Sequence, residues 1–127
     1  ESLFKDRNFE SIGYQEILNK IVFDAGFSNL NLISGNVFET IPDFLNKNPG
    51  FRASIINFDL DTYEPTIFCL QKLWDRLVLG GIMIFDEYGF NQWTESQAVD
   101  EFITEKKLNI KNTIYKAPSA YLIKENM

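Results

Sequence analysis

Residues 53–64 read ASIINFDLDTYE, an apolar run that ends abruptly in two aspartates. The apolar part, Ala53–Phe58, is short and β-branched at its centre, which predicts a buried strand. The segment that follows, Tyr63–Val78, repeats its apolar residues at helical spacing and predicts an amphipathic helix. A second apolar run, Ile82–Phe85, comes next and also ends in carboxylates. Strand, helix and strand in this order predict a β-α-β unit, whose two strands run parallel and side by side.

The rest of the chain continues this alternation of helices and strands. Helical spacing predicts three further helices: Ser11–Ala25, a short Val37–Asn46 that Pro42 interrupts, and Thr94–Lys106. Apolar or alternating runs predict three further strands: Leu30–Ile33, Ile110–Tyr115 and Tyr121–Ile123. We therefore expect one α/β domain over residues 1–127. Its sheet would be mostly parallel, covered by helices on both faces in a three-layer sandwich, and would end in an antiparallel hairpin.

Composition and charge exclude several classes of protein. Hydrophobic residues make up 45% of the 127 residues and include 12 Phe, which is ample for a packed core. The net charge of −6, without a basic cluster, argues against nucleic-acid binding, and no apolar stretch is long enough for a membrane span. The single cysteine, Cys69, cannot form an internal disulfide, which fits a cytoplasmic protein. Because there is no histidine, proton chemistry would fall to carboxylates, Lys, Tyr or a bound ion.

Acidic residues follow both strands of the predicted β-α-β unit. Ligands of open α/β sheets bind beyond the carboxyl ends of the strands, so Asp59, Asp86 and Glu87 are expected to meet at one rim. Converging carboxylates repel one another unless a cation lies between them, and oxygen ligands suit Mg²⁺ or a similar divalent ion. The pattern therefore predicts a metal site, with Asp61 as an alternative ligand. The same acids could instead cap a helix or lie in a solvated loop, and the residues alone favour neither interpretation.

Three motifs carry a family resemblance: FDLDTYEPT at residues 58–66, LGGIMIFDEYG at 79–89 and QAVDEFI at 97–103. In this order they resemble the C-terminal part of the macrocin O-methyltransferase family, from about Gly13 to the last hairpin. Members of that family use S-adenosylmethionine and a metal ion to methylate sugar hydroxyls. The resemblance implies a Rossmann-like methyltransferase fold without its first two strands. It also implies S-adenosylmethionine and Mg²⁺ as cofactors and a small, sugar-like substrate.

The resemblance further implies roles for individual residues. Asp59 and Asp86 would be metal ligands, and Glu87 stands where the family usually has Asp, so its carboxylate would reach one methylene further. The implied cofactor site consists of Asp59 and of the turn at Gly35, Asn36 and Val37, which stands where the family cradles adenine. That turn could equally be an ordinary connection between a strand and a helix. Tyr63, Tyr88 and Trp93 are the candidates for contacts with the substrate, although buried aromatic residues more often belong to a core.

Two features of the family are missing from this sequence. It has no glycine-rich cofactor loop, and no histidine that could serve as the general base, so the catalytic residue is not assigned. The chain could be a fragment, a shortened protein that lost catalysis, or one half of a site that another chain completes. Without the missing strands, either the predicted strands Leu30–Ile33 and Ala53–Phe58 pair directly or one sheet edge is left open, and an open edge predicts a homo-oligomer.

Three functions compete at this stage. The first is an O-methyltransferase domain that acts on a sugar or polyol hydroxyl. The second is a non-catalytic binding or assembly module that keeps the fold. A phosphatase-like metal enzyme is the third, and it is disfavoured because no Lys or Ser/Thr phosphate-binding loop accompanies the acids.

Overall fold

A computed structural model describes residues 11–90 and 94–126 of the chain. The chain divides into two compact units, one up to Asn36 and one from Val37 onward. The first unit contains helix α1 (Ser11–Asp24), which the sequence predicts. Gly26 ends this helix with a φ of 76°, and the amides of Gly26 and Phe27 donate to the carbonyls of Phe23 and Val22. This pair of hydrogen bonds is the Schellman arrangement that a glycine at the end of a helix allows.

The strand predicted at Leu30–Ile33 is wrong, because residues 30–33 have no regular secondary structure. A strand is stable only when its backbone groups pair with a neighbouring strand. Leu30–Ile33 has no partner among the strands that the structure describes, since the sheet consists of four later strands. A short apolar run predicts extended backbone but does not supply a partner.

The second unit contains the other helices and all strands of the described residues. In chain order they are α2 (Val37–Lys47), β1 (Ala53–Phe58), α3 (Tyr63–Leu73), a 3₁₀ turn (Trp74–Arg76), β2 (Leu77–Phe85), α4 (Glu95–Lys106), β3 (Lys111–Asn112) and β4 (Ala120–Ile123). The α/β class is thus confirmed. Helix α2 is confirmed, and it passes through Pro42 without an interruption. None of the helices in residues 11–90 and 94–126 is long and apolar enough to cross a membrane.

The boundary between α3 and β2 differs from the predicted one. The helix was expected to reach Val78, but it ends at Leu73, and Val78 lies in β2. Buried Lys124 accounts for part of this difference, because its ammonium donates to the carbonyls of Trp74 (2.9 Å) and Leu77 (3.0 Å). These carbonyls therefore find a partner outside the helix, at the point where the chain turns into the strand.

The sheet has the strand order β1-β2-β4-β3. Strands β1 and β2 are parallel, as predicted, and the pairs β2–β4 and β3–β4 are antiparallel, so the predicted hairpin is confirmed. With one parallel and two antiparallel pairs the sheet is mixed, because the strand expected before β1 does not form. The rows Ile56–Met83–Leu122 and Phe58–Phe85–Ala120 run across one face of the sheet. The rows Ile55–Ile82–Ile123 and Asn57–Ile84–Tyr121 run across the other face.

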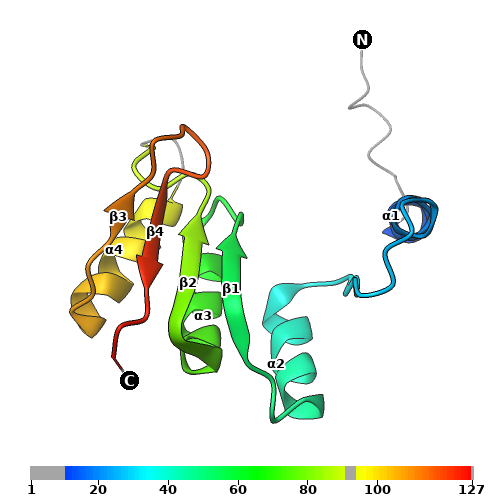
Figure 1. Cartoon of the computed structure of the whole chain (residues 1–127), viewed down its shortest axis with the longest axis horizontal. Coiled ribbons are helices and arrows are strands. Elements are labelled where there is room, and N and C mark those ends of the chain that lie inside the picture. The colour runs from blue at the N-terminus through cyan, green and yellow to red at the C-terminus, as the bar shows by residue number, and fades with distance from the viewer. Residues whose placement is uncertain (1–10, 91–93, 127) are drawn as a thin grey trace. The chain divides into compact units, whose positions relative to one another are not determined.

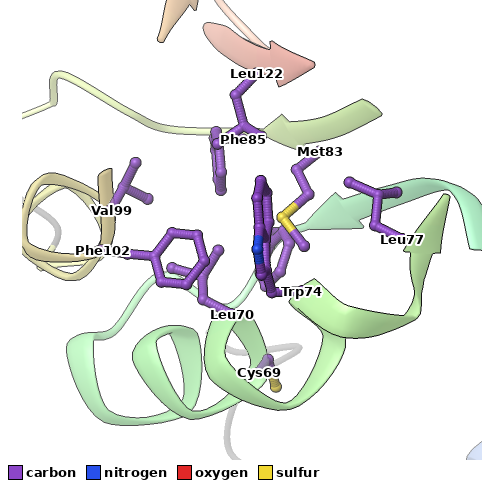
Figure 2. Close-up of a cluster of buried hydrophobic side chains, with 10 residues drawn as sticks. Cys69, Leu70, Trp74, Leu77, Met83, Phe85, Val99, Phe102 and Leu122 are labelled. Carbon is purple, nitrogen blue, oxygen red and sulfur yellow. The ribbon is translucent and has the colours of Figure 1, made fainter. Parts of the chain in front are cut away.

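The hydrophobic core lies between the first of these faces and helices α3 and α4, which both pack on that side (Figure 1). Figure 2 shows Phe85, Met83 and Leu122 of the sheet pointing at Leu70, Val99 and Phe102 of the helices. Helix α2 packs on α3, where the rings of Phe38 and Phe68 lie 4.9 Å apart. The second face lacks the helical layer expected from the sequence within the described part of this unit, and Ile55 on that face is 62% exposed.

Candidate functional site

The ends of β1 and β2 lie side by side at one rim of the sheet. Phe58 and Phe85 are partners in the parallel register, and the amide of Asp86 donates to the carbonyl of Phe58 at 3.1 Å. Asp59 and Asp86 therefore leave adjacent strands at the same level. This is the neighbourhood that the β-α-β pattern predicts for the two acidic segments.

The chain turns sharply between β1 and α3. Asp61 has a φ of 60°, and the amide of Thr62 donates to the carbonyl of Leu60 at 2.6 Å, which closes a three-residue γ-turn. A positive φ is uncommon for residues other than glycine, but Asp tolerates it better than most. Backbone strain of this kind gathers at functional sites. The turn places Asp61 between the strand end and the N-terminus of the helix.

Helix α4 holds the loop that follows β2. Three hydrogen bonds join them: the amide of Glu87 to Glu95 Oε2 (3.0 Å), the amide of Gly89 to Ser96 Oγ (2.8 Å), and the hydroxyl of Tyr88 to Asp100 Oδ1 (2.7 Å). The same end of α4 also holds the start of α3, because the amide of Tyr63 donates to Thr94 Oγ1 at 2.7 Å. Helix α4 thus contacts both acidic segments.

Glu95 is a member of this site that the sequence analysis missed. Its side chain is 0% exposed. The pKa of Glu95 is raised to about 7, mainly by burial. The hydrogen bond from the amide of Glu87 lowers this pKa, whereas the nearby carboxylates of Asp61, Asp86 and Glu87 raise it. The signal was present, because Glu95 lies three and four residues before the buried Ala98 and Val99 and so shares their face of α4.

The electrostatics of Glu87 show that the acids are close enough to interact. Burial raises the pKa of Glu87, and so do the carboxylates of Asp61, Asp86 and Asp59, whereas Lys116 lowers it. Glu87 Oε2 and Glu95 Oε1 are buried without a hydrogen-bond partner in the described residues. Such oxygens, together with an all-carboxylate donor set, fit a hard divalent cation in their chemistry.

The geometry of a metal centre is not assembled in this structure. Among residues 11–90 and 94–126, no three Asp, Glu or Cys side chains stand so that they could hold one metal ion. Asp59, Asp86 and Glu87 are thus brought to one rim, but their carboxylates do not converge on a point. Mutual repulsion gives a physical reason for this separation.

The two tyrosines proposed for substrate contacts are both tied to α4. The hydroxyl of Tyr63 donates to Glu101 Oε2 at 2.6 Å, and this hydrogen bond is the main cause of its raised pKa. Burial, followed by the hydrogen bond to Asp100, raises the pKa of Tyr88 to about 12. Both phenols are therefore neutral donors at physiological pH. Tyr88, Asp100 and Glu101 line part of a shallow hollow of about 520 Å³. Trp93 lies outside the described residues.

The predicted cofactor residues belong to different parts of the chain. Gly35 and Asn36 end the first unit, Val37 begins α2 in the second, and Asp59 follows β1. Gly35 has a φ of 135°, a conformation that favours glycine. The role of these four residues in cofactor binding stays a prediction.

Comparisons with known proteins give a family and a fold for this chain. The family profile described as Macrocin-O-methyltransferase (TylF) matches residues 16–117. A search of curated protein sequences gives no match. Among solved structures, the apo form of CalS11, a TDP-rhamnose 3'-O-methyltransferase of calicheamicin biosynthesis, is 29% identical with a TM-score of 0.76. The match covers 91% of this chain and 54% of that one.

Two further structures also match most of this chain. A second structure of CalS11, described as a calicheamicin methyltransferase, is 29% identical with a TM-score of 0.75. The match covers 87% of this chain and 47% of that one. The O-methyltransferase NovP is 22% identical with a TM-score of 0.69, and the match covers 92% of this chain and 45% of NovP. The likeness to NovP concerns the fold alone. The chain spans about half the length of each of these proteins.

Proposed function

The chain belongs to the macrocin O-methyltransferase family, and on that premise we propose that it acts as part of an S-adenosylmethionine-dependent O-methyltransferase. The proposed acceptor is a hydroxyl group of a sugar or a similar polyol. CalS11, which is described as acting on TDP-rhamnose, supports this substrate class. The observation that carries the proposal is the pairing of two acidic strand ends, after Phe58 and Phe85, in a chain that the family profile matches.

The proposed reaction is a methyl transfer between a sulfonium and an oxygen. The hydroxyl oxygen of the acceptor forms a bond to the methyl carbon, the bond from that carbon to sulfur breaks, and S-adenosylhomocysteine leaves as a neutral thioether. The hydroxyl proton needs an acceptor. The sequence has no histidine, and the raised pKa values of Tyr63 and Tyr88 keep both phenols protonated at physiological pH, so neither is available as the base. We therefore assign the proton to a carboxylate at the strand ends that does not hold the cation described next.

A divalent cation such as Mg²⁺ is the second part of the proposal. Asp59, Asp86 and Glu87 would hold it, with Asp61 as the alternative ligand. A bound cation would supply positive charge that lowers the pKa of the acceptor hydroxyl. The buried, unpartnered oxygen of Glu87 and the carboxylates around it support this assignment. Because the three ligands do not converge in the described structure, their side chains would have to move together.

The remaining proposed roles concern binding. Gly35, Asn36, Val37 and Asp59 are proposed to contact S-adenosylmethionine. Tyr63 and Tyr88 flank the acidic segments, and their hydroxyls are held by α4, so we propose that these rings help to position the acceptor.

Calorimetry tests the proposed function. We expect the full chain to bind S-adenosylhomocysteine, and Mg²⁺ to strengthen binding or to bind in its own right. Asp86→Asn should abolish the effect of Mg²⁺, because it removes one proposed ligand. Asp75→Asn is the matched control, since Asp75 is an exposed acid in the turn after the far end of α3. No binding with or without Mg²⁺ would contradict the proposal.

A non-catalytic binding or assembly module is the second candidate. The exposed apolar face of the sheet, where Ile55 is accessible, favours it because such a face suits contact with a partner. In the same calorimetric experiment, this candidate predicts no heat from S-adenosylhomocysteine or Mg²⁺.

A further inference from the structure

We propose that Glu95 is a positioning residue that holds the two acidic strand ends at a fixed spacing. The inference rests on the proposed function, because the spacing matters only if the acids act together. Glu95 itself is outside the predicted ligand set. It lies in the first turn of α4, the helix that contacts the two segments carrying Asp61 and Glu87.

A single residue bridges the two segments through both its backbone and its side chain. The amide of Glu95 donates to the carbonyl of Asp61 at 3.3 Å. Its carboxylate oxygen Oε2 accepts from the amide of Glu87 at 3.0 Å. A shift of either segment relative to the other would break one of these bonds. The bond to Thr94 from the amide of Tyr63 adds a second tie between α4 and the first segment.

Burial makes this bridge effective. The side chain of Glu95 is 0% exposed, so water does not compete for the amide of Glu87. An amide that lost its acceptor in such a place would remain unsatisfied, and the loop would have to move to reach water. The backbone position of Glu87 therefore depends on Glu95. This matters because the carboxylate of Glu87 is one of the proposed ligands of the cation.

The chemistry of the side chain points to a role beyond stability. A buried carboxylate is costly unless it is fully paired. Glu95 lies among other acids, and its second oxygen, Oε1, has no hydrogen-bond partner in the described residues. An apolar residue would fill the same space at lower cost, but it could not accept from the amide of Glu87.

Three variants separate positioning from a general effect on stability. Glu95→Leu removes the acceptor, and Glu95→Gln keeps an acceptor oxygen at the same reach. Ser96→Ala is the matched control, because it removes the neighbouring bond from α4 to the amide of Gly89, which carries no proposed ligand. Should Glu95→Leu fail to fold, Glu95→Ala removes the same acceptor.

The first readout does not depend on a metal. In metal-free protein, we expect Glu95→Leu to increase hydrogen exchange of the Glu87 amide, measured by NMR, by about tenfold or more. Glu95→Gln should preserve its protection. Ser96→Ala should expose the amide of Gly89 and leave that of Glu87 protected. An unchanged Glu87 amide in Glu95→Leu would overturn the proposal.

The second readout is the affinity for Mn²⁺, measured by electron paramagnetic resonance as a probe for the divalent cation. Glu95→Leu should raise Kd by about 10- to 100-fold, the range typical of residues that orient metal ligands. Glu95→Gln and Ser96→Ala should stay close to wild type. Equal affinities in wild type and Glu95→Leu, or an equal loss in Glu95→Gln, would contradict positioning through the hydrogen bond.

The two proposals fail in different ways. If wild-type protein does not bind Mn²⁺, the cation of the proposed function is wrong. Glu87 exchange in Glu95→Leu then decides alone whether Glu95 holds the segments. If wild-type protein binds Mn²⁺ and Asp86→Asn does not, the cation site stands, and the Glu95 variants test only the positioning role.

Discussion

Lys124 shows how one charged side chain can be accommodated inside this core. It is 6% exposed, and its ammonium lies 4.9 Å from the centre of the Trp74 ring. Its two hydrogen bonds to backbone carbonyls compensate for the loss of water. These carbonyls belong to Trp74 and Leu77, so the residue after β4 stabilises the turn by which the chain leaves α3. A residue that appears to be a simple surface cation in the sequence thus links three elements.

Cys69 leads to a prediction about pH. Burial raises the pKa of its thiol to about 11, whereas an unfolded cysteine has a pKa near 8.5. A raised pKa means that the native state holds the proton more tightly, so its contribution to stability is complete below about pH 8.5 and is lost as the pH rises toward 11. We expect the free energy of unfolding to fall by on the order of 1–2 kcal/mol between pH 8.5 and pH 10.

Urea unfolding at these two pH values measures the effect, with Cys69→Ala as the control that should lose most of the slope. The native thiol should also react slowly with a disulfide reagent at pH 8, at least about 100-fold slower than in urea. Rapid modification of native protein would show that Cys69 is accessible and would contradict the burial argument.

At the scale of the elements, the bend at Gly80 and Gly81 is the least tolerant part of β2. Gly80 has a φ of 75°, and its amide donates to the carbonyl of Lys124 at 2.8 Å. The register between β1 and β2 shifts at the same place, after the pair Ala53–Leu77. A glycine pair here lets β2 bend while both neighbouring strands remain paired.

Gly81→Ala should therefore destabilise the protein. An added Cβ would lie 2.7 Å from Leu77 Cδ1 and 2.8 Å from the carbonyl oxygen of Val78, which is closer than real contacts allow. We expect a loss of about 1–3 kcal/mol in the free energy of unfolding, measured by urea denaturation. Gly50→Ala is the matched control, because no atom lies within 4 Å of its added Cβ. Equal stabilities of the two variants would refute the steric argument.

The sequence predicts those elements whose signal is local. Strand β1 has the predicted bounds, Ala53–Phe58. Helix α4 begins at Glu95, one residue later than predicted, because Thr94 is its N-cap. Whether Leu30–Ile33 forms a strand could not be predicted from those residues alone, because a strand needs a partner from a distant segment. The length of β2 was missed because Gly80 and Gly81 look like the end of a connection, although the strand passes through them.

In the candidate site, too, some features follow from local sequence and others depend on distant contacts. The neighbourhood of Asp59 and Asp86 follows from the β-α-β order and is confirmed by the register. Glu95 was missed because an acid in the first turn of a helix is normally explained by the helix dipole. Its spacing to Ala98 and Val99 places it on the buried face of α4, but the acceptance of a hydrogen bond from Glu87 depends on how α4 packs against the loop after β2, which no local pattern contains.

At the scale of the whole molecule, the face and edge of the sheet that no described element of the second unit covers predict self-association. Strand β1 is an edge strand, and the rows that begin at Ile55 and Asn57 carry mostly apolar residues. Exposed edges and apolar faces promote pairing between copies. We expect a mass above that of the monomer in sedimentation experiments, increasing with protein concentration.

Ile55→Lys should shift the chain toward the monomer, because it places a charge on this face. Leu79→Lys is the control: Leu79 is 55% exposed, similar to the 62% of Ile55, but it lies outside the paired rows. A wild-type chain that sediments as a monomer at all concentrations would exclude association through this surface.

The central place of β2 also determines when the fold can be completed during synthesis. Its partner β4 follows it only after α4 and β3, so a growing chain that has emerged as far as Lys106 has β2 paired on one side at most. Met83 and Phe85 then lack the cover that Leu122 and Ala120 later provide. Completion of the core must wait until β4 has left the ribosome, and until then the nascent chain exposes apolar surface that the finished fold buries.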